Sequence, residues 1–234
     1  MEQIYTIPVN EAFDFVGESG ECACPFCVLH KKLQNDEIEI ILGASMMEPD
    51  IRIKTNEQGF CEAHYGMMLR RKRMLGMGLI LESHLAEVEK RIDGPTLLGN
   101  KAQAAINSLG ELEDGCYVCR RINKNLSAMI ATAAYLFETD YSFREKFERV
   151  PYFCLPHYKR MLEYAKGKMN KRNFAEFYKA AHEIEAKYIK ALGSDVSWFC
   201  KKFQYGYEEE PWYNAKDSVQ RSIKFLRGDS GHND

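Results

Sequence analysis

The chain has 234 residues, long enough for one large domain or two small ones with a real hydrophobic core. Apolar residues make up 45% and charged residues 28%, a balance that excludes wholesale disorder. With 32 basic and 34 acidic side chains the formal charge is -2, so nucleic-acid or acidic-membrane binding would need a local basic patch. The longest apolar stretch, residues 125–137, is too short to span a bilayer.

Apolar residues recur with helical spacing along the first half of the chain. We expect helices there over residues 11–16, 25–42, 61–92 and 96–112. Residues 46–59 are expected to form a loop, because Pro49, Asn56 and Gly59 interrupt the apolar pattern.

The second half repeats this plan. We expect helices there over residues 119–137, 154–165, 174–192 and 211–226. Gly193 suits the end of the third, and Pro211 suits the first turn of the fourth. We expect a frayed tail from Asp229 onward. Since no segment of more than a few residues alternates like a strand, the predicted fold class is mainly α.

Six of the eight cysteines fall into short motifs with a second cysteine or a histidine. The motifs are Cys24-Pro-Phe-Cys27, Cys61-Glu-Ala-His64, Cys116-Tyr-Val-Cys119 and Cys154-Leu-Pro-His157. Two ligands at this spacing can bind one ion, and a CxxC with a CxxH completes a tetrahedral Cys₃His set, a standard structural zinc site. The sequence therefore predicts two zinc ions.

The motifs belong to an internal duplication. CxxC and CxxH are separated by 33 residues in the first copy and by 34 in the second, and the pattern FCxxHYxxML occurs at 60–69 and 153–162. The copies cover roughly residues 21–93 and 113–192. Because the spacers are nearly equal, we expect each copy to close its own site. The expected sites are Cys24, Cys27, Cys61 and His64, and Cys116, Cys119, Cys154 and His157.

Two other kinds of chemistry use such cysteines. An iron–sulfur cluster is one alternative, but one histidine in each set of four favours zinc. Thiol redox catalysis is another, since Cys24-Pro-Phe-Cys27 is similar to a glutaredoxin tetrad. A redox dithiol has no need of the CxxH partner, and its usual βαβ context is missing here. Each motif is instead expected at a helix start, where unpaired amides stabilise thiolates.

Other residues stand out beside the motifs. Tyr65 and Tyr158 each follow a ligand histidine and are expected to lie close to the metals, outside the ligand set. A basic run could contact phosphate, although a solvated helix face is the simpler interpretation. The run consists of Arg70, Arg71, Lys72 and Arg73.

The remaining cysteines and histidines lack metal-type spacing. Cys22 is expected to be a bystander thiol and Cys200 a buried core residue. The histidines without motif partners are expected at the surface or at its boundary. They are His30, His84 and His182.

No catalytic constellation is present: the sequence has no HExxH, GxSxG, P-loop or GxGxxG motif, and we assign no catalytic residue. The N-terminal segment lacks a basic region followed by a cleavage-type site, so we expect a cytoplasmic protein. The favoured function is a non-enzymatic zinc protein with a protein partner and no membrane contact. A nucleic-acid-binding regulator is the alternative. We expect a first module over 1–94, a second over 95–192, and a C-terminal helical segment with its tail over 193–234.

Several segments together resemble a bacterial family of unknown function from anaerobic Gram-positive bacteria with paired CxxC and CxxH motifs. They are Cys24–Cys27, the stretch 47–64, the second CxxC, the stretch 153–162 and Trp198-Phe-Cys-Lys-Lys-Phe203. The resemblance extends to about Gly228. It implies no activity, substrate or partner.

Overall fold

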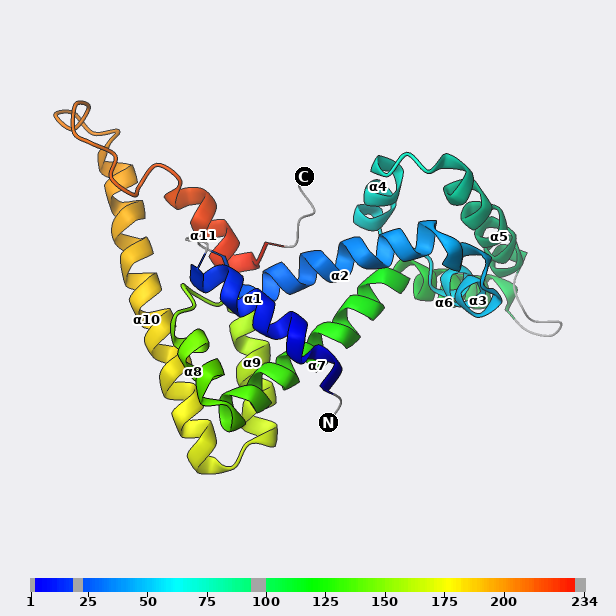
Figure 1. Cartoon of the computed structure of the whole chain (residues 1–234). Coiled ribbons are helices and arrows are strands. Elements are labelled where there is room, and N and C mark those ends of the chain that lie inside the picture. Colours follow the sequence, from blue (N-terminus) through cyan, green and yellow to red (C-terminus); the bar gives the residue numbers. More distant parts are fainter. Residues whose placement is uncertain (1–2, 19–22, 94–99, 230–234) are drawn as a thin grey trace. The chain divides into compact units, whose positions relative to one another are not determined.

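The computed structural model describes residues 3–18, 23–93 and 100–229, and every regular element in these ranges is a helix (Figure 1). The predicted mainly α class is therefore confirmed. Cys22 lies outside the described residues, as do residues 96–99 of an expected helix. No helix in the described ranges combines the length and the apolar character that a membrane crossing requires.

The chain forms two compact units. Unit 1 comprises the described residues up to Lys31 and from Leu126 onward, and unit 2 comprises the described residues between them. The borders fall inside two long helices, α2 (Pro25–Leu42) and α7 (Tyr117–Thr139). Each unit therefore combines residues from both copies of the repeat.

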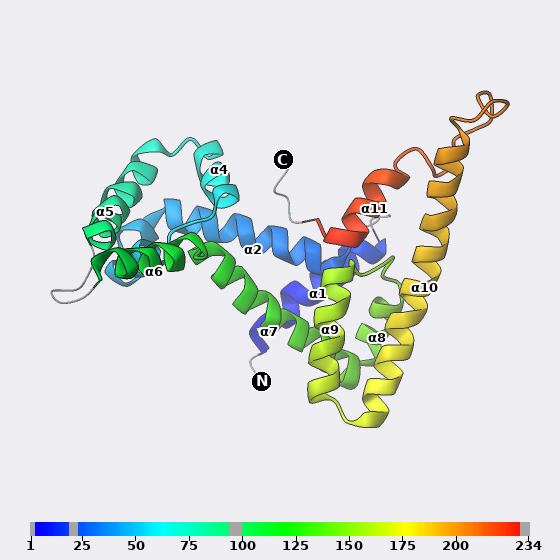
Figure 2. The same cartoon turned by 180° about the vertical axis from the view of Figure 1, so that it is seen from behind.

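Unit 1 holds one end of α2, one end of α7 and five complete α-helices. These are α1 (Thr6–Glu18, after the short 3₁₀ helix η1, Gln3–Tyr5), α8 (Tyr141–Glu148), α9 (Leu155–Lys168), α10 (Lys171–Lys201) and α11 (Ser218–Arg227). Helices α9 and α10 lie side by side, α11 packs against both, and α1 packs against α8 (Figure 1; Figure 2). The core is rich in fully buried phenylalanines. They are Phe13, Phe26, Phe143, Phe147, Phe153 and Phe177.

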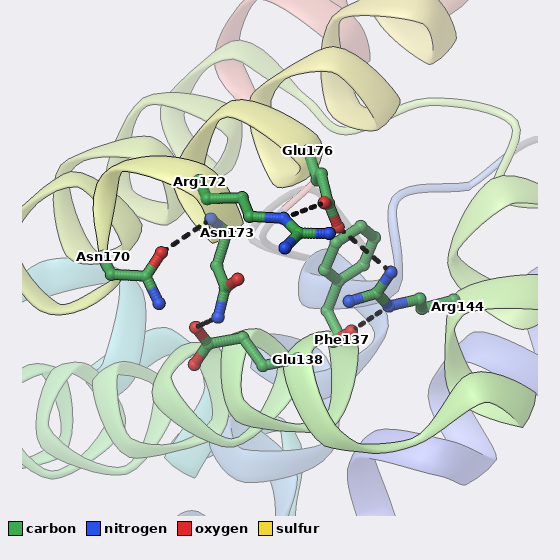
Figure 3. A network of polar contacts seen from close by, with 7 residues as sticks. All are labelled: Phe137, Glu138, Arg144, Asn170, Arg172, Asn173 and Glu176. Atoms are coloured by element: carbon green, nitrogen blue, oxygen red, sulfur yellow. Dashed lines mark hydrogen bonds and ion pairs between the residues drawn. The ribbon is translucent and has the colours of Figure 1, made fainter.

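A polar network joins the end of α7, the start of α8 and the start of α10 (Figure 3). Glu176 accepts hydrogen bonds at 3.3 Å from both Arg144 and Arg172. Arg144 also donates to the main-chain oxygen of Phe137. Asn173 donates to Glu138 at 2.7 Å, and the Asn170 side chain caps α10 by accepting from the Asn173 amide at 2.9 Å. Hydrogen bonds among these side chains thus hold three helices of unit 1 together at one end.

Unit 2 holds the other ends of α2 and α7 and five further elements. These are η2 (Ala44–Met47), α3 (Pro49–Gln58), α4 (Glu62–Arg70), α5 (Met74–Asp93) and α6 (Lys101–Glu113). Helix α5 packs against α3, α4 and α6. The buried cluster beneath them includes Ile38, Phe60, Met68, Ile80 and Val118.

The loop expected at 46–59 is wrong, because most of it is helical. Glu48 is extended at the N-cap, and Pro49 occupies the first turn of α3, where its missing N–H leaves no bond unmade. Thr55 is buried and Ile51 packs against the core cluster, so burial of one face stabilises α3. The helix ends at Gly59, whose φ of 58° is left-handed.

The single helix expected over 61–92 is also wrong. It breaks between α4 and α5, where Lys72 adopts a φ of 56°. The residues on either side, Arg71 and Arg73, both form ion pairs with Glu39 at 3.2 and 2.6 Å. These pairs hold the turn at a position where the sequence has no glycine or proline.

The C-terminal part of the chain departs from the prediction at two points. Helix α10 continues through Gly193 to Lys201, and α11 begins at Ser218 instead of Pro211. Between them the Lys202 ammonium donates to the main-chain oxygens of Tyr207, Glu208 and Glu210 at 2.5–2.7 Å. Residues 211–217 form turns instead of a helix, and Tyr213 has a left-handed φ of 48°.

Candidate metal centres

All four motifs lie at helix N-termini, as predicted. Cys24 and Cys116 directly precede α2 and α7, while Cys61 and Cys154 are the extended N-caps of α4 and α9. In the CxxH motifs the carbonyl of the cysteine accepts the first helical hydrogen bond, from Tyr65 at 3.0 Å and from the equivalent tyrosine of α9 at 2.8 Å. The first turn of a helix therefore places the two ligands of each motif on one side.

The first group, which we call site 1, lies in unit 1 and consists of Cys24, Cys27, Cys154 and His157. All four residues are buried. The Nδ1 atom of His157 lies 3.7, 3.5 and 3.1 Å from the sulfurs of Cys24, Cys27 and Cys154. The sulfurs of Cys27 and Cys154 are 3.6 Å apart.

The second group, site 2, lies in unit 2 and consists of Cys61, His64, Cys116 and Cys119. The Nδ1 atom of His64 lies 3.1, 3.3 and 3.5 Å from the sulfurs of Cys61, Cys116 and Cys119. The sulfurs of Cys61 and Cys119 are 3.9 Å apart. Cys61 and Cys119 are half-buried, so site 2 is nearer the surface of its unit.

Both groups have the dimensions of a tetrahedral metal site. Zn–S and Zn–N bonds of about 2.3 and 2.0–2.1 Å place two sulfurs about 3.8 Å apart, and a sulfur and a nitrogen about 3.6 Å apart. The observed S···S separations of 3.6 and 3.9 Å bracket the first value, and the S···N separations of 3.1–3.7 Å include the second. All the described cysteines are free thiols. The residues therefore fit a four-coordinate ion.

The eight predicted ligand residues come together, but the predicted pairing is wrong. Each CxxC meets the CxxH of the other copy, so site 1 encloses site 2 along the chain. The reason is the long helix that follows each CxxC. Helix α2 has 18 residues, about 27 Å in length, and carries the chain from Cys27 into unit 2, where the first CxxH lies. Helix α7 carries it back toward Cys154 in the same way.

The phenylalanine core supports site 1 directly. Phe26 lies between the two cysteines of its motif, and its ring packs edge-on against His157 with centroids 5.9 Å apart. Phe153, which precedes Cys154, packs at 5.9 Å from Phe26. The Phe153 amide donates to the buried carboxylate of Glu185 at 2.7 Å, and this fixes the backbone that leads into Cys154.

A close backbone approach supports site 2. The Tyr117 amide donates to the Gly59 carbonyl at 3.0 Å, which joins the segment before Cys61 to the segment after Cys116. A Cβ atom at Gly115 would lie 2.5 Å from the Gln58 carbonyl oxygen, so only glycine permits this approach.

Sequence reasoning missed two polar residues that support the sites. The Gln34 amide lies 3.1 Å from Nε2 of His64, the ring nitrogen that faces away from the sulfurs. The Gln34 atom at this distance is the amide nitrogen. With a metal on Nδ1, Nε2 carries a proton, and the Gln34 amide would turn its oxygen toward Nε2 as the acceptor. The sequence did contain a signal, because both are polar residues on an apolar helix face. Gln34 shares its face with Ile38 and Ile41, and Glu185 lies between Ala181 and Leu192.

The thiols within each site perturb one another. In site 1, hydrogen bonds from Cys154 and Cys24 hold the pKa of Cys27 far below its ordinary value, while burial raises the pKa of Cys24. In site 2, the hydrogen bond with Cys119 lowers the pKa of Cys116 to about 3, and the same bond raises the pKa of Cys119. The thiols of each cluster therefore do not ionise independently of one another.

The tyrosines after the ligand histidines differ in their surroundings. Tyr65 packs edge-on against Phe60 at 5.4 Å, and burial followed by the charge of Cys116 raises the pKa of its hydroxyl. Burial raises the pKa of Tyr158 too, but the charges that add to it come from Tyr178 and Glu185. Tyr158 therefore faces α10, and a shared role beside the metals stays a prediction.

The other singled-out residues occupy ordinary positions, with two corrections. Cys200 is exposed instead of buried, since its helix presents that face to solvent. His84 is buried, because its ring packs against Gly59 and its Nδ1 atom lies 3.0 Å from the Asn56 carbonyl oxygen. Of the remaining pair, His30 is half-buried and His182 exposed.

The chain matches one known protein family. The model of a family of unknown function, DUF6062, matches residues 1–233. No curated protein matches the chain. No solved structure matches it either.

Proposed function

We propose that this chain, which belongs to the DUF6062 family, is a zinc protein that holds one ion in site 1 and one in site 2. The observation that carries the proposal is the donor chemistry of the two groups. Each offers three sulfurs and one imidazole nitrogen at tetrahedral spacing, a set typical of structural zinc. An iron–sulfur cluster is less consistent with a histidine in each set.

The ions are expected to stabilise the fold, not to carry out chemistry. A catalytic zinc keeps a coordination position open for water or substrate, usually beside three protein ligands. In both sites four donors already complete a tetrahedron, and all donors of site 1 are buried. We therefore assign the metals a structural role and the protein a non-enzymatic one.

The energetic argument is strong because each ion joins distant parts of the chain. A structural zinc site contributes about 10–16 kcal/mol of apparent binding free energy. A folded protein of ordinary size is stable by only about 5–15 kcal/mol. Loss of either ion is therefore expected to destabilise the unit that contains it.

The surface of unit 1 favours a protein partner. The loop after α10 is orange in Figure 1. It carries three aromatic side chains that are largely in solvent. Phe203, Tyr205 and Tyr213 are 74%, 98% and 72% exposed. Lys202 holds this loop through three main-chain carbonyls, so the aromatics are presented on a preorganised segment, as at protein-binding surfaces. We propose an interaction or adaptor role in the reducing cytoplasm, where free thiols persist.

Nucleic-acid binding through the basic run is the second candidate, and the ion pairs weaken it. Arg71 and Arg73 both bind Glu39, so half of the run is engaged within unit 2. A second basic cluster lies in unit 1 and consists of Lys166, Lys168, Lys171 and Arg172. If this candidate is right, the protein binds DNA or RNA with an affinity that falls steeply as salt rises.

Elemental analysis of protein purified without added metal tests the proposal. Two zinc ions per chain support it. A brown protein with visible absorption and bound iron would replace zinc by an iron–sulfur cluster, and a folded chain without metal would end the proposal. The partner is sought with a photo-crosslinking residue at Tyr205 in the native cell. A reproducible crosslink to one protein supports the adaptor role, and its absence counts against this surface.

A further inference from the structure

The backbone that follows α11 reaches site 1. The Asp229 amide donates to the sulfur of Cys27 at 3.3 Å. Gly228 precedes it with a φ of 82°, and a Cβ atom there would lie 3.4 Å from the Cys154 sulfur and 3.8 Å from the Cys27 sulfur. The expectation that the chain frays from Asp229 onward is therefore wrong for Asp229 itself, and residues 230–234 lie outside the described part.

Side chains hold this segment in place. The Asp229 carboxylate lies between two lysines, 2.9 Å from Lys31 and 3.1 Å from Lys224. Lys31 stands one helical turn after Cys27 on α2, and Lys224 belongs to α11. The carboxylate thus ties α11 to the helix that begins at site 1.

Helix α11 itself packs against the segment that enters Cys154. Its buried Phe225 packs against a stacked pair of tyrosines, with centroids 5.9 Å from Tyr152 and 5.4 Å from Tyr188. Tyr152 is two residues before Cys154. Arg221 of the same helix pairs with Asp195 of α10 at 2.9 Å. Helix α11 and the residues that follow it therefore contact the chain beside both motifs of site 1.

We infer that Gly228 and Asp229 are positioning residues of site 1, and that metal in this site controls the docking of α11. The inference rests on the proposed function, since it needs an ion at site 1. A Cys₃His zinc centre carries a net charge of -1, which favours the N–H donor of Asp229 and the nearby Lys31. The ion also fixes the two sulfurs against which Gly228 packs. Because coupling is reciprocal, whatever α11 adds to metal affinity the metal adds to α11 docking.

A cavity beside site 1 links the docking of α11 to the rate at which the site releases its ion. It has a volume of about 650 Å³, and its lining includes Cys24, Cys27, Lys31, Lys224 and Asp229. A chelator in this cavity reaches the site past the α11 segment. The segment is thus expected to govern how fast site 1 loses its ion.

Zinc release from the full chain to a chromogenic chelator tests the inference, with site 2 as an internal reference. In G228A a side chain must adopt the φ of 82° directly beside the sulfurs, and D229P lacks the N–H donor. Both should release zinc from site 1 about tenfold faster and leave site 2 unchanged. The variant G206A is the matched control, because Gly206 has a similar φ of 90° but no atom within 4 Å of an added Cβ. If G228A and D229P release zinc as G206A does, the inference fails.

Hydrogen exchange measures the reciprocal effect. The variant C24S/C154S removes two ligands of site 1, and its α11 amides should exchange about tenfold faster than in the zinc-loaded protein, while peptides of unit 2 keep their rates. Unchanged protection of α11 would refute the control of docking by the metal. A chain purified without zinc would refute the proposed function as well, whereas two bound ions with unaltered release in G228A and D229P would refute this inference alone.

Discussion

The exchange of CxxH motifs between the two repeat copies can be tested by removing cysteines in pairs. The variant C24S/C154S takes two of the three cysteines from site 1, whereas C24S/C61S takes one from each site. The two variants lose the same number of thiols. They differ only in whether the lost ligands share an ion.

The size of the effect follows from the donor sets. About 10–16 kcal/mol of apparent zinc binding is spread over four ligands, so loss of two ligands costs roughly half of it. A cost of about 5–8 kcal/mol weakens binding by about 10⁴- to 10⁶-fold, enough to empty a site during purification. Loss of one ligand costs about 3–4 kcal/mol, close to a 10³-fold decrease in affinity. Site 2 is intact in C24S/C154S, so this variant should keep one zinc at wild-type affinity.

Zinc per chain is measured after dialysis against increasing concentrations of a chelator of known affinity. We expect one tightly held ion in C24S/C154S and none in C24S/C61S, because both of its sites are damaged. The control C200S removes an exposed cysteine outside both sites and should keep two ions. If C24S/C61S keeps one tight ion while C24S/C154S keeps none, each copy closes its own site and the exchange is refuted.

Three further outcomes follow from buried groups and close contacts. Burial raises the pKa of Glu185 from 4.5 to about 7. The protonated side chain therefore stabilises the fold in acid, and this contribution is lost as the pH rises from 4.5 to 7. E185Q should therefore gain about 1–3 kcal/mol over wild type between pH 5.5 and 8 in urea denaturation, and a pH-independent difference would contradict this assignment. G115A should displace the backbone at Cys116 and weaken zinc in site 2, whereas G110A, with no atom within 4 Å of its new Cβ, should bind zinc normally; equal zinc affinities would contradict the steric argument. K202M leaves main-chain carbonyls without their donor and should cost about 1–3 kcal/mol, with faster hydrogen exchange over 203–210; unchanged exchange would show that Lys202 does not hold the loop.

The sequence was sufficient for the helical class and for the residues of the two Cys₃His groups, because both depend on local spacing. It was insufficient for the pairing of the motifs, since Cys61-Glu-Ala-His64 has the same donors whichever CxxC it meets. Only the direction of the helix after Cys27 decides between the partners. The break at Lys72 was hidden for a similar reason: it depends on Glu39, a residue on another helix. Asp229 was out of reach because two of its partners, Cys27 and Lys31, lie about two hundred positions away in the chain.

The nesting of the two sites sets an order for their assembly during synthesis. Cys119 completes the ligands of site 2, but site 1 must wait for His157, 38 residues later. At about 5–20 residues per second, this interval is about 2 to 8 s on the ribosome. The inner site can therefore take its ion while Cys24 and Cys27 still lack their partners. For these seconds the nascent chain carries the dithiol of Cys24 and Cys27 without the CxxH motif that completes its group.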